Sequence, residues 1–390
     1  MQAYSQRLSW NLSPNWLSLL IQEKRNAGVP VLDLTLSNPT QAFAEYPHEE
    51  IRRAYANITE FTYRPDPLGL KEARCAIARV YTEQGVPISP DQLVLTASSS
   101  EAYALLFKLF CDPEDEVLVP APSYPLFDFL ARLESIRIVP YRLQYDGIWC
   151  IDLASLRERI SSRTRAVVIV NPNNPTGSFL KESEKNELFE LARRHDLPII
   201  SDEVFRDYSL GSTGSQVTTL INSDMVLSFS LNGLSKTAGM PQMKLGWIAI
   251  NGPAAERELA RARLEILLDT YLSVSTPVQS ALPELLRIGS RIQHRIAERT
   301  KRNLAGLAEL LKDSPAHCLH TEGGWSAIVR LPHTAAEEVW VARLLEEQAM
   351  IVQPGYFFDM DSEPYVVMSL ITPPELFDEG IRRLRSFIQC

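Results

Sequence analysis

The sequence has few of the features that mark membrane, secreted or nucleic-acid-binding proteins. No apolar run in its 390 residues approaches the ~20 that a membrane-spanning helix needs, and the polar segment 1–12 has no signal-peptide core. The formal net charge is −9 and long basic tracts are missing, which argues against binding to nucleic acid or to an anionic membrane. The five cysteines are scattered without a Cys-x-x-Cys pair, so we expect a reduced, cytoplasmic protein without disulfides.

Motifs that identify several other classes of site are also missing. No Gly-x-Gly-x-x-Gly or Gly-x-x-x-x-Gly-Lys loop occurs, which argues against dinucleotide and P-loop binding. His317, Cys318 and His320 lie close together, but they lack a nearby fourth ligand, so no metal site is expected. Neither Ser123 nor the run 98–100 sits in a nucleophile-elbow motif.

The sequence does contain a regular alternation of helical stretches and short apolar runs. Near-continuous apolar strands between helices are typical of a parallel sheet that is covered on both faces. We therefore expect an α/β fold with a mostly parallel, seven-stranded sheet. The runs 225–229 and 245–250 are joined without room for a crossover helix, so one strand should be antiparallel. The predicted strands are 92–96, 117–120, 136–141, 166–170, 197–201, 225–229 and 245–250.

The length of the chain predicts more than one domain. We expect residues 1–47 to form an N-terminal arm and part of a small domain, and residues 48–275 to form the large domain. Isoleucines recur at every fourth position from 288 to 296, as on one face of a helix, so 276–311 should be an interdomain helix. Residues 312–390 then complete the small α/β domain.

The stretch Ser228–Trp247 carries Lys236 in a loop of small residues between two apolar runs. A lysine in such a loop has its stem packed and its amine directed into a cavity. Partial desolvation lowers the pKa of an amine and makes it nucleophilic, as a Schiff-base lysine requires. From this stretch alone, a lysine in an exposed surface loop is an equally good interpretation.

Four more loops follow predicted strands, at the edge where open α/β sheets bind ligands. The serines of Thr96–Ala102 would hold an anion at a helix N-terminus or simply cap the helix. Tyr124, between two prolines, would stack on an aromatic ligand or pack at a helix entry. Asn171–Gly177 is a sharp turn that would aim an amide at a ligand oxygen. Asp202, at the end of a buried strand, needs a cation such as a protonated ring nitrogen, unless it forms an exposed acidic pair with Glu203.

The order of these motifs resembles the class I/II aminotransferase family, pyridoxal-phosphate enzymes of the aspartate aminotransferase fold. Asn171–Gly177 is followed by Asp202-Glu203-Val204, and then by Ser235-Lys236 with a Gly-x-Pro and a further glycine downstream. The likeness extends from Leu34 to the last predicted helix. It implies transfer of an amino group between an amino compound and a keto acid, in a homodimer with shared active sites.

The resemblance also implies roles for single residues around pyridoxal 5'-phosphate. Lys236 would form the aldimine and move the proton between substrate and cofactor. Asp202 would keep the ring nitrogen protonated, so that the ring acts as an electron sink. Asn174 would donate to the phenolic oxygen of the ring, and Tyr124 would stack on its face.

Other residues would hold the phosphate. The resemblance assigns this role to Ser99, Ser100 and Ser235, and to Tyr63 reaching across to the neighbouring subunit. Eight residues after the lysine the family usually has an arginine, and this sequence has Lys244. A lysine still binds phosphate, but as a point charge without the bidentate fork.

Two further positions depart from the family pattern. Three residues after Asp202 the family usually has a tyrosine that hydrogen-bonds the phenolic oxygen, and this sequence has Phe205. Near the C-terminus the family usually has an arginine, two residues before a serine, that clamps the substrate carboxylate. Val367 holds that place before Ser369. We therefore expect weak activity with aspartate, alanine and the common aromatic amino acids.

Two alternatives to transamination stay open. A lyase, a decarboxylase or another non-transaminating pyridoxal-phosphate enzyme would use the same Lys236, Asp202 and Asn174, because these residues serve every reaction of this scaffold. A regulatory protein that keeps the fold without catalysis is the other alternative, and the presence of all three residues argues against it. We expect no nucleic-acid or membrane partner.

Overall fold

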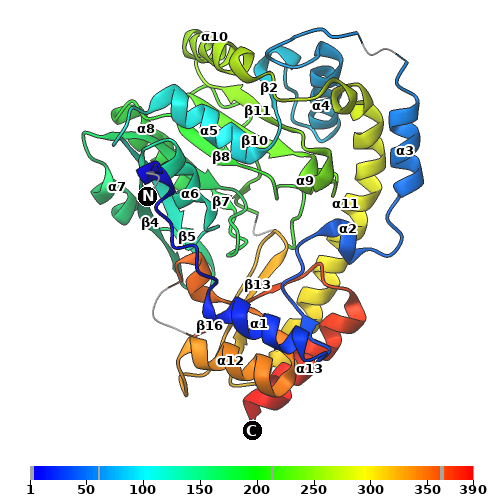
Figure 1. Ribbon diagram of the computed structural model, residues 1–390. Coiled ribbons are helices and arrows are strands. Elements are labelled where there is room, and N and C mark those ends of the chain that lie inside the picture. Colours follow the sequence, from blue (N-terminus) through cyan, green and yellow to red (C-terminus); the bar gives the residue numbers. More distant parts are fainter. Residues whose placement is uncertain (1–3, 60–61, 212–213, 361–363, 390) are drawn as a thin grey trace.

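The computed structural model describes residues 4–59, 62–211, 214–360 and 364–389. Its main feature is an eight-stranded sheet, called here the large sheet (Figure 1). The predicted α/β fold with a mostly parallel sheet is confirmed. The sheet has one strand more than the expected seven, the short edge strand β5, which forms a hairpin with β4. In spatial order the strands are β2 (Leu93–Thr96), β11 (Gly246–Asn251), β10 (Ser228–Gly233), β8 (Ile199–Asp202), β6 (Thr164–Val170), β3 (Glu116–Ala121), β4 (Arg137–Tyr145) and β5 (Trp149–Ile151).

The expected antiparallel strand is β11, which runs against both of its neighbours, β2 and β10. The strand β10 begins three residues later than the predicted run 225–229 and extends to Gly233. Its later residues include Ser230 and Asn232, which are buried but hydrogen-bonded, so a search for apolar residues ends too early. The extension matters because it brings the strand directly to the loop of Lys236.

Helices cover both faces of the large sheet, because alternate strand residues point to opposite sides. On one face, a single apolar cluster joins the sheet to three helices. On the opposite face, two further apolar clusters join the sheet to four helices. On the first face lie α5 (Ser99–Phe110), α6 (Leu126–Leu133) and α10 (Ala254–Tyr271). On the second lie α4 (Lys71–Glu83), α7 (Leu153–Arg159), α8 (Glu182–Arg194) and the first half of α11 (Thr276–Leu311).

A second, four-stranded sheet has its own apolar core and is called here the small sheet. Its strands, in spatial order, are β12 (His317–Cys318), β13 (Ser326–Arg330), β16 (Tyr365–Ser369) and β15 (Gln353–Pro354). The helices α1 (Trp16–Asn26), α12 (Glu337–Gln348) and α13 (Pro374–Gln389) pack around it, below the large sheet in Figure 1. The N-terminal segment joins this core through β1 (Leu32–Asp33), which pairs with β14 (Met350–Ile351).

The helix α11 connects the two cores, as Figure 1 shows on the right of the molecule. Its bounds match the predicted 276–311. Ile288, Ile292 and Ile296 are buried in a cluster with the large sheet, and Leu307 and Leu311 are buried in the core of the small sheet. The exact division of the chain into domains stays a prediction.

The remaining elements are short. They are α2 (Pro39–Ala42), α3 (His48–Ala56), α9 (Leu234–Thr237), β7 (Leu180–Lys181), β9 (Gln216–Val217) and the 3-10 turns η1 (Gln6–Leu8), η2 (Pro90–Gln92), η3 (Pro241–Met243) and η4 (Gly355–Phe358). Within the described ranges, no helix combines the length and the apolar character that crossing a bilayer requires.

Candidate active site

The ends of four neighbouring strands bring the predicted loops together at one edge of the large sheet. Asp202, the last residue of β8, lies beside Val170 of β6 and Leu231 of β10. Gly246, the first residue of the antiparallel β11, lies between Gly233 of β10 and Thr96 of β2. The loops that begin at 97, 171, 203 and 234 therefore leave the sheet side by side.

Lys236 lies in the single-turn helix α9, directly after β10. Its amine is 4.6 Å from the ring centroid of Trp325 and 5.2 Å from that of Phe205. Burial lowers the pKa of Lys236 to about 8, and the negative charge of Asp202 partly opposes this shift. The prediction of a desolvated amine thus agrees with the structure, and the alternative of an exposed surface lysine does not.

The carboxylate of Asp202 faces the same site. It accepts hydrogen bonds from the hydroxyl of Tyr103 at 3.0 Å and from the backbone amide of Val204 at 3.1 Å. Burial raises the pKa of Asp202 to about 6, because desolvation outweighs these two hydrogen bonds. At neutral pH the side chain is an anion in a site of low polarity, and a nearby cation would stabilise it.

The neighbouring Glu203 points to the opposite side of the strand end and has a structural environment. Its carboxylate is fully buried and accepts from the hydroxyls of Ser201, Ser230 and Thr219. The backbone amide of Leu220 is a fourth donor to it. The two acidic residues therefore do not form an exposed pair at a turn.

The loop 171–177 uses its asparagines differently. Asn171 and Asn173 hold the loop itself, through bonds with Val217, Leu180, Thr176 and Ser123. Asn174 instead accepts a hydrogen bond at its amide oxygen from the hydroxyl of Ser326 in the small sheet, at 3.1 Å. Its amide nitrogen has no partner among the described residues and remains a free donor.

The predicted phosphate-binding residues come from segments that meet at the corner formed by Gly246, Gly233 and Thr96. Ser98 caps α5 by accepting from the amide of Glu101 at 3.1 Å, so Ser99 and Ser100 are the first two residues of this 12-residue helix. Both are partly exposed, as is Ser235 in α9. Lys244 is exposed and lies two residues before Gly246. A helix N-terminus, three hydroxyls and an ammonium group suit an anion.

The two tyrosines are less buried than the rest. Tyr124 follows β3 at the same edge of the sheet, and 49% of its side-chain surface is exposed, so its ring is available to a ligand. Tyr63 is 71% exposed and lines a surface cavity with Gln279 and Ser273. The structure of one chain therefore does not bring Tyr63 together with the other predicted site residues.

Three residues of the site were missed by sequence reasoning. Tyr103 lies one helical turn after Ser99 in α5, so this spacing was a signal that it faces the same way. Trp325 and Ser326 reach the site from the small sheet and contact Lys236 and Asn174. No local pattern in the sequence marks them, because the contacts join segments about 90 residues or more apart.

Phe205 and Val367, two residues that depart from the family pattern, both lie in apolar surroundings. Phe205 is buried and packs edge-on against Trp325, with ring centroids 5.3 Å apart. Val367 is 1% exposed and lies opposite Ile328 in the small sheet. It shares a sheet face with Ser326, and its cluster of buried neighbours includes Trp149. A buried apolar cluster thus continues the face from which Ser326 reaches Asn174.

A family model described as aminotransferase class I and II matches residues 29–384. The chain belongs to this family. It is a pyridoxal-phosphate-dependent aminotransferase of the aspartate aminotransferase fold, as the resemblance in its motifs implied.

Individual relatives agree with this family. The aminotransferase is 29% identical over 350 residues to glutamate-pyruvate aminotransferase AlaA of Escherichia coli strain K12, which covers 85% of this chain and 84% of that one. Its structure is similar to that of alanine aminotransferase from Pyrococcus furiosus, with a TM-score of 0.88, 26% identity and coverage of 99% and 100%. Aspartate aminotransferase from Thermotoga maritima shares the fold, with a TM-score of 0.84, 24% identity and coverage of 99% and 100%.

Proposed function

We propose that this aminotransferase uses Lys236 as its Schiff-base lysine and acts on an amino compound that presents no carboxylate to Val367. The proposed role of Lys236 is supported by the environment of its amine. It lies near the rings of both Trp325 and Phe205, and burial lowers the pKa of Lys236 to about 8. With this pKa about a tenth of the amine is unprotonated at pH 7, far more than for an ordinary lysine, and attack on a carbonyl carbon requires this form.

The residues beside Lys236 have the chemistry to hold pyridoxal 5'-phosphate, which supplies an electron sink when bound. In this proposal the carboxylate of Asp202 pairs with the protonated ring nitrogen, a cation that stabilises this buried anion directly. The free amide nitrogen of Asn174 donates to the phenolic oxygen. The exposed ring of Tyr124 stacks on the cofactor ring.

The phosphate is assigned to the corner where α5 and α9 begin. The N-terminus of α5 offers backbone amides together with the hydroxyls of Ser99 and Ser100. Ser235 and Lys244 complete the set. Tyr63 is assigned to the phosphate of the neighbouring subunit, and its high exposure in a single chain supports this role.

The second half of the proposal rests on the small sheet. The named relatives act on alanine, glutamate or aspartate, and a buried carboxylate of such a substrate needs a positive partner. In this chain the position two residues before Ser369 carries Val367, which is buried among Trp149, Ile328 and other apolar residues. An apolar cluster at this position favours a substrate whose reacting carbon bears an apolar or neutral group.

A panel of amino donors tests the proposal. The cofactor-loaded protein is supplied with a keto acid and with primary amines, ω-amino acids, alanine, glutamate, aspartate and tyrosine, and both products are measured. We expect the highest kcat/KM with a donor that has no α-carboxylate. A high kcat/KM with alanine or glutamate would contradict the substrate class. Release of carbon dioxide without transfer of the amino group would identify the decarboxylase alternative.

We further propose that the enzyme is a cytoplasmic homodimer with both active sites at the interface. The exposed face of α10 supports this, because Leu259 and Ile266, seven residues apart on one side of the helix, are at the surface, and Tyr63 is exposed as well. Apolar side chains gathered on one face favour association. Sedimentation should give twice the mass of the chain, and Ile266→Lys should shift the equilibrium towards the monomer. A wild-type protein that sediments as a monomer would rule out shared sites.

A further inference from the structure

A buried ion pair joins β7, which follows the loop of Asn174, to the segment that leads into β13 of the small sheet. The amine of Lys181, in β7, lies 2.7 Å from a carboxylate oxygen of Glu322, and the two side chains are 8% and 2% exposed. The same amine donates to the backbone carbonyls of Trp149 at 2.8 Å and of Phe179 at 2.7 Å. All three protons of the ammonium group are therefore used.

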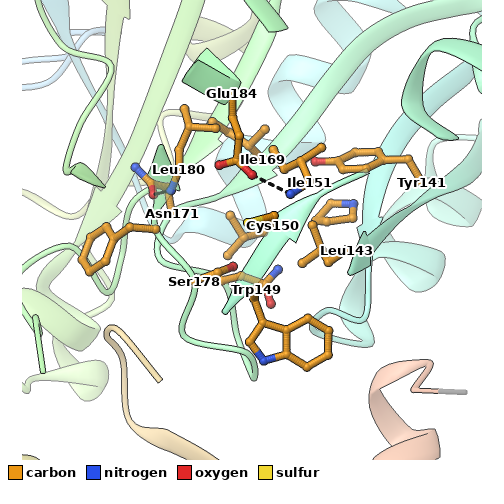
Figure 2. A pocket seen from close by; sticks show the side chains of 14 residues that line it. Tyr141, Leu143, Trp149, Cys150, Ile151, Ile169, Asn171, Ser178, Leu180 and Glu184 are labelled. Atoms are coloured by element: carbon orange, nitrogen blue, oxygen red, sulfur yellow. Dashed lines mark hydrogen bonds between the residues drawn. The ribbon is translucent and has the colours of Figure 1, made fainter. Parts of the chain in front are cut away.

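The other nearby carboxylate is committed elsewhere. Glu184 accepts from the backbone amide of Ile151 at 2.6 Å, the dashed line in Figure 2, and from the backbone amide of Lys181 at 2.8 Å. Figure 2 shows this bond beside the cavity whose wall includes Trp149 and Asn171. Among the described residues, Glu322 is thus the carboxylate that pairs with the amine of Lys181.

Glu322 has further bonds to the large-sheet side. Its carboxylate also accepts from the backbone amide of Phe179 at 3.0 Å and from the side chain of Gln216 at 3.1 Å. Its own carbonyl accepts from the amide of Leu210 at 2.8 Å, and the amide of Gly324 donates to Tyr208 at 2.9 Å. The segment 322–324 is therefore bound on both sides by loops of the large sheet.

Backbone packing at this junction is tight. A Cβ on Gly323 would lie 2.7 Å from the ring of Phe179, and a Cβ on Gly177 would lie 2.4 Å from the carbonyl oxygen of Gly323. Two glycines in succession give segment 321–326 a flexible backbone, and Gly324 has a φ of +86°. Because this backbone is flexible, the position of segment 321–326 depends on the bonds that Glu322 makes.

The next two residues enter the site. Trp325 lies over the amine of Lys236, and Ser326 holds the amide oxygen of Asn174. We propose that Lys181 and Glu322 are a positioning pair, which fixes segment 321–326 so that Trp325 covers the lysine and Ser326 orients the asparagine. Neither residue touches the reacting atoms. Buried ion pairs often add little net stability, so a role in geometry accounts better for this one.

This inference rests on the proposed roles of Lys236 and Asn174, and its test uses the cofactor-free protein. The double variant Lys181→Met/Glu322→Gln removes both charges, and neither single charge is left buried without a partner. We expect it to fold. Hydrogen exchange at the amides of Leu210 and Gly324 should become about tenfold faster, because these bonds no longer have a fixed partner segment. The midpoint of amine titration at Lys236, read by chemical labelling, should rise from about 8 towards the value of an ordinary lysine.

A matched control removes an ion pair elsewhere. Arg165 and Asp115 are 3.0 Å apart beside the large sheet, and Arg165→Gln/Asp115→Asn should leave both readouts at their wild-type values. If Lys181→Met/Glu322→Gln fails to fold, Glu322→Asp, which keeps the charge and shortens the side chain, is measured in the same way and should change both readouts in the same direction. Wild-type exchange and titration in a folded variant would overturn the proposal. If Lys236 is not the Schiff-base lysine, cofactor labelling fails in the wild-type protein, while exchange at the junction still responds to the pair.

Discussion

The hydroxyl of Tyr208 donates a hydrogen bond of 2.6 Å to the backbone carbonyl of Lys236. Tyr208 is fully buried, and its ring packs against Trp325 at 5.0 Å. Its proton is therefore committed to the chain that carries the lysine. It is not free to replace the donor that the family usually has at the position of Phe205.

We predict that Phe205→Tyr adds this donor to the phenolic oxygen of the bound cofactor. A hydrogen bond to a charged oxygen is worth about 1.5–3 kcal/mol, which corresponds to about 1–2 units of pKa. The donor favours the ionised oxygen, so the visible band of the bound cofactor should titrate at a lower pH in Phe205→Tyr than in the wild type. Absorbance measured against pH gives both midpoints.

Tyr208→Phe is the control for this comparison. It removes the bond to the Lys236 carbonyl without removing a donor from the cofactor, so its midpoint should stay near that of the wild type. Coincident midpoints for wild type and Phe205→Tyr would contradict the prediction. If the midpoint shifts downward in Phe205→Tyr but the shift disappears on heating, its cause would be altered packing, because Phe205 also contacts Trp325.

Borohydride reduction of the cofactor-loaded protein should attach the cofactor to Lys236 alone. Burial lowers the pKa of Lys236 to about 8, so the yield of labelled peptide should rise as the pH passes through that value. Lys236→Ala should remove the label. Lys244→Ala is the matched control, because it should weaken phosphate binding and still leave the label on Lys236. Recovery of the label on another lysine would show that the site was assigned wrongly.

The sequence could predict the order of elements because apolar periodicity is local. The bounds of α11 match the predicted 276–311, and its isoleucines do face a core. The end of β10 was predicted too early, because Ser230 and Asn232 are polar and become buried only through hydrogen bonds with Glu203 and Thr237. Periodicity contains no information on such bonds.

The residues of the candidate site also fall into those that the sequence could predict and those that it could not. Lys236, Asp202 and Asn174 follow strands and could be predicted from loops that end at one sheet edge. Trp325 and Ser326 could not, because their approach depends on how the small sheet docks against the large one. That docking is decided by side chains such as those of Lys181 and Glu322, which no local pattern joins.

Asp202→Asn tests the charge beside the lysine. The change keeps the shape and removes a preorganised negative charge, so amino transfer should slow by about 3 kcal/mol or more in activation free energy. In the cofactor-free protein it should also lower the pKa of Lys236 below about 8, because the carboxylate favours the charged amine. Steady-state kinetics and pH-dependent labelling of Lys236 measure the two effects. Turnover near that of the wild type would exclude the proposed role.

Tyr103→Phe is a milder change at the same site than Asp202→Asn. It removes one of the two hydrogen bonds to the Asp202 carboxylate and leaves the charge in place. Because that bond favours the ionised form, its loss should raise the pKa of Asp202 further above about 6. Activity should then fall at mildly acidic pH and recover at higher pH, whereas Asp202→Asn should stay slow at every pH.

Val367→Arg tests whether one residue decides the substrate class. Val367 is 1% exposed and packs in a cluster with Trp149, Ile328 and Phe358, so a guanidinium at this position would be buried among apolar side chains. We predict a loss of about 3 kcal/mol or more in the free energy of unfolding, measured by urea denaturation, and no gain in kcat/KM with alanine or glutamate. Val367→Ile is the control, since it stays apolar and adds one methylene group, and it should keep most of the stability. If Val367→Arg is instead as stable as the wild type and gains activity with alanine, the apolar cluster must open to the substrate, and Val367 alone would be what excludes a carboxylate from this site.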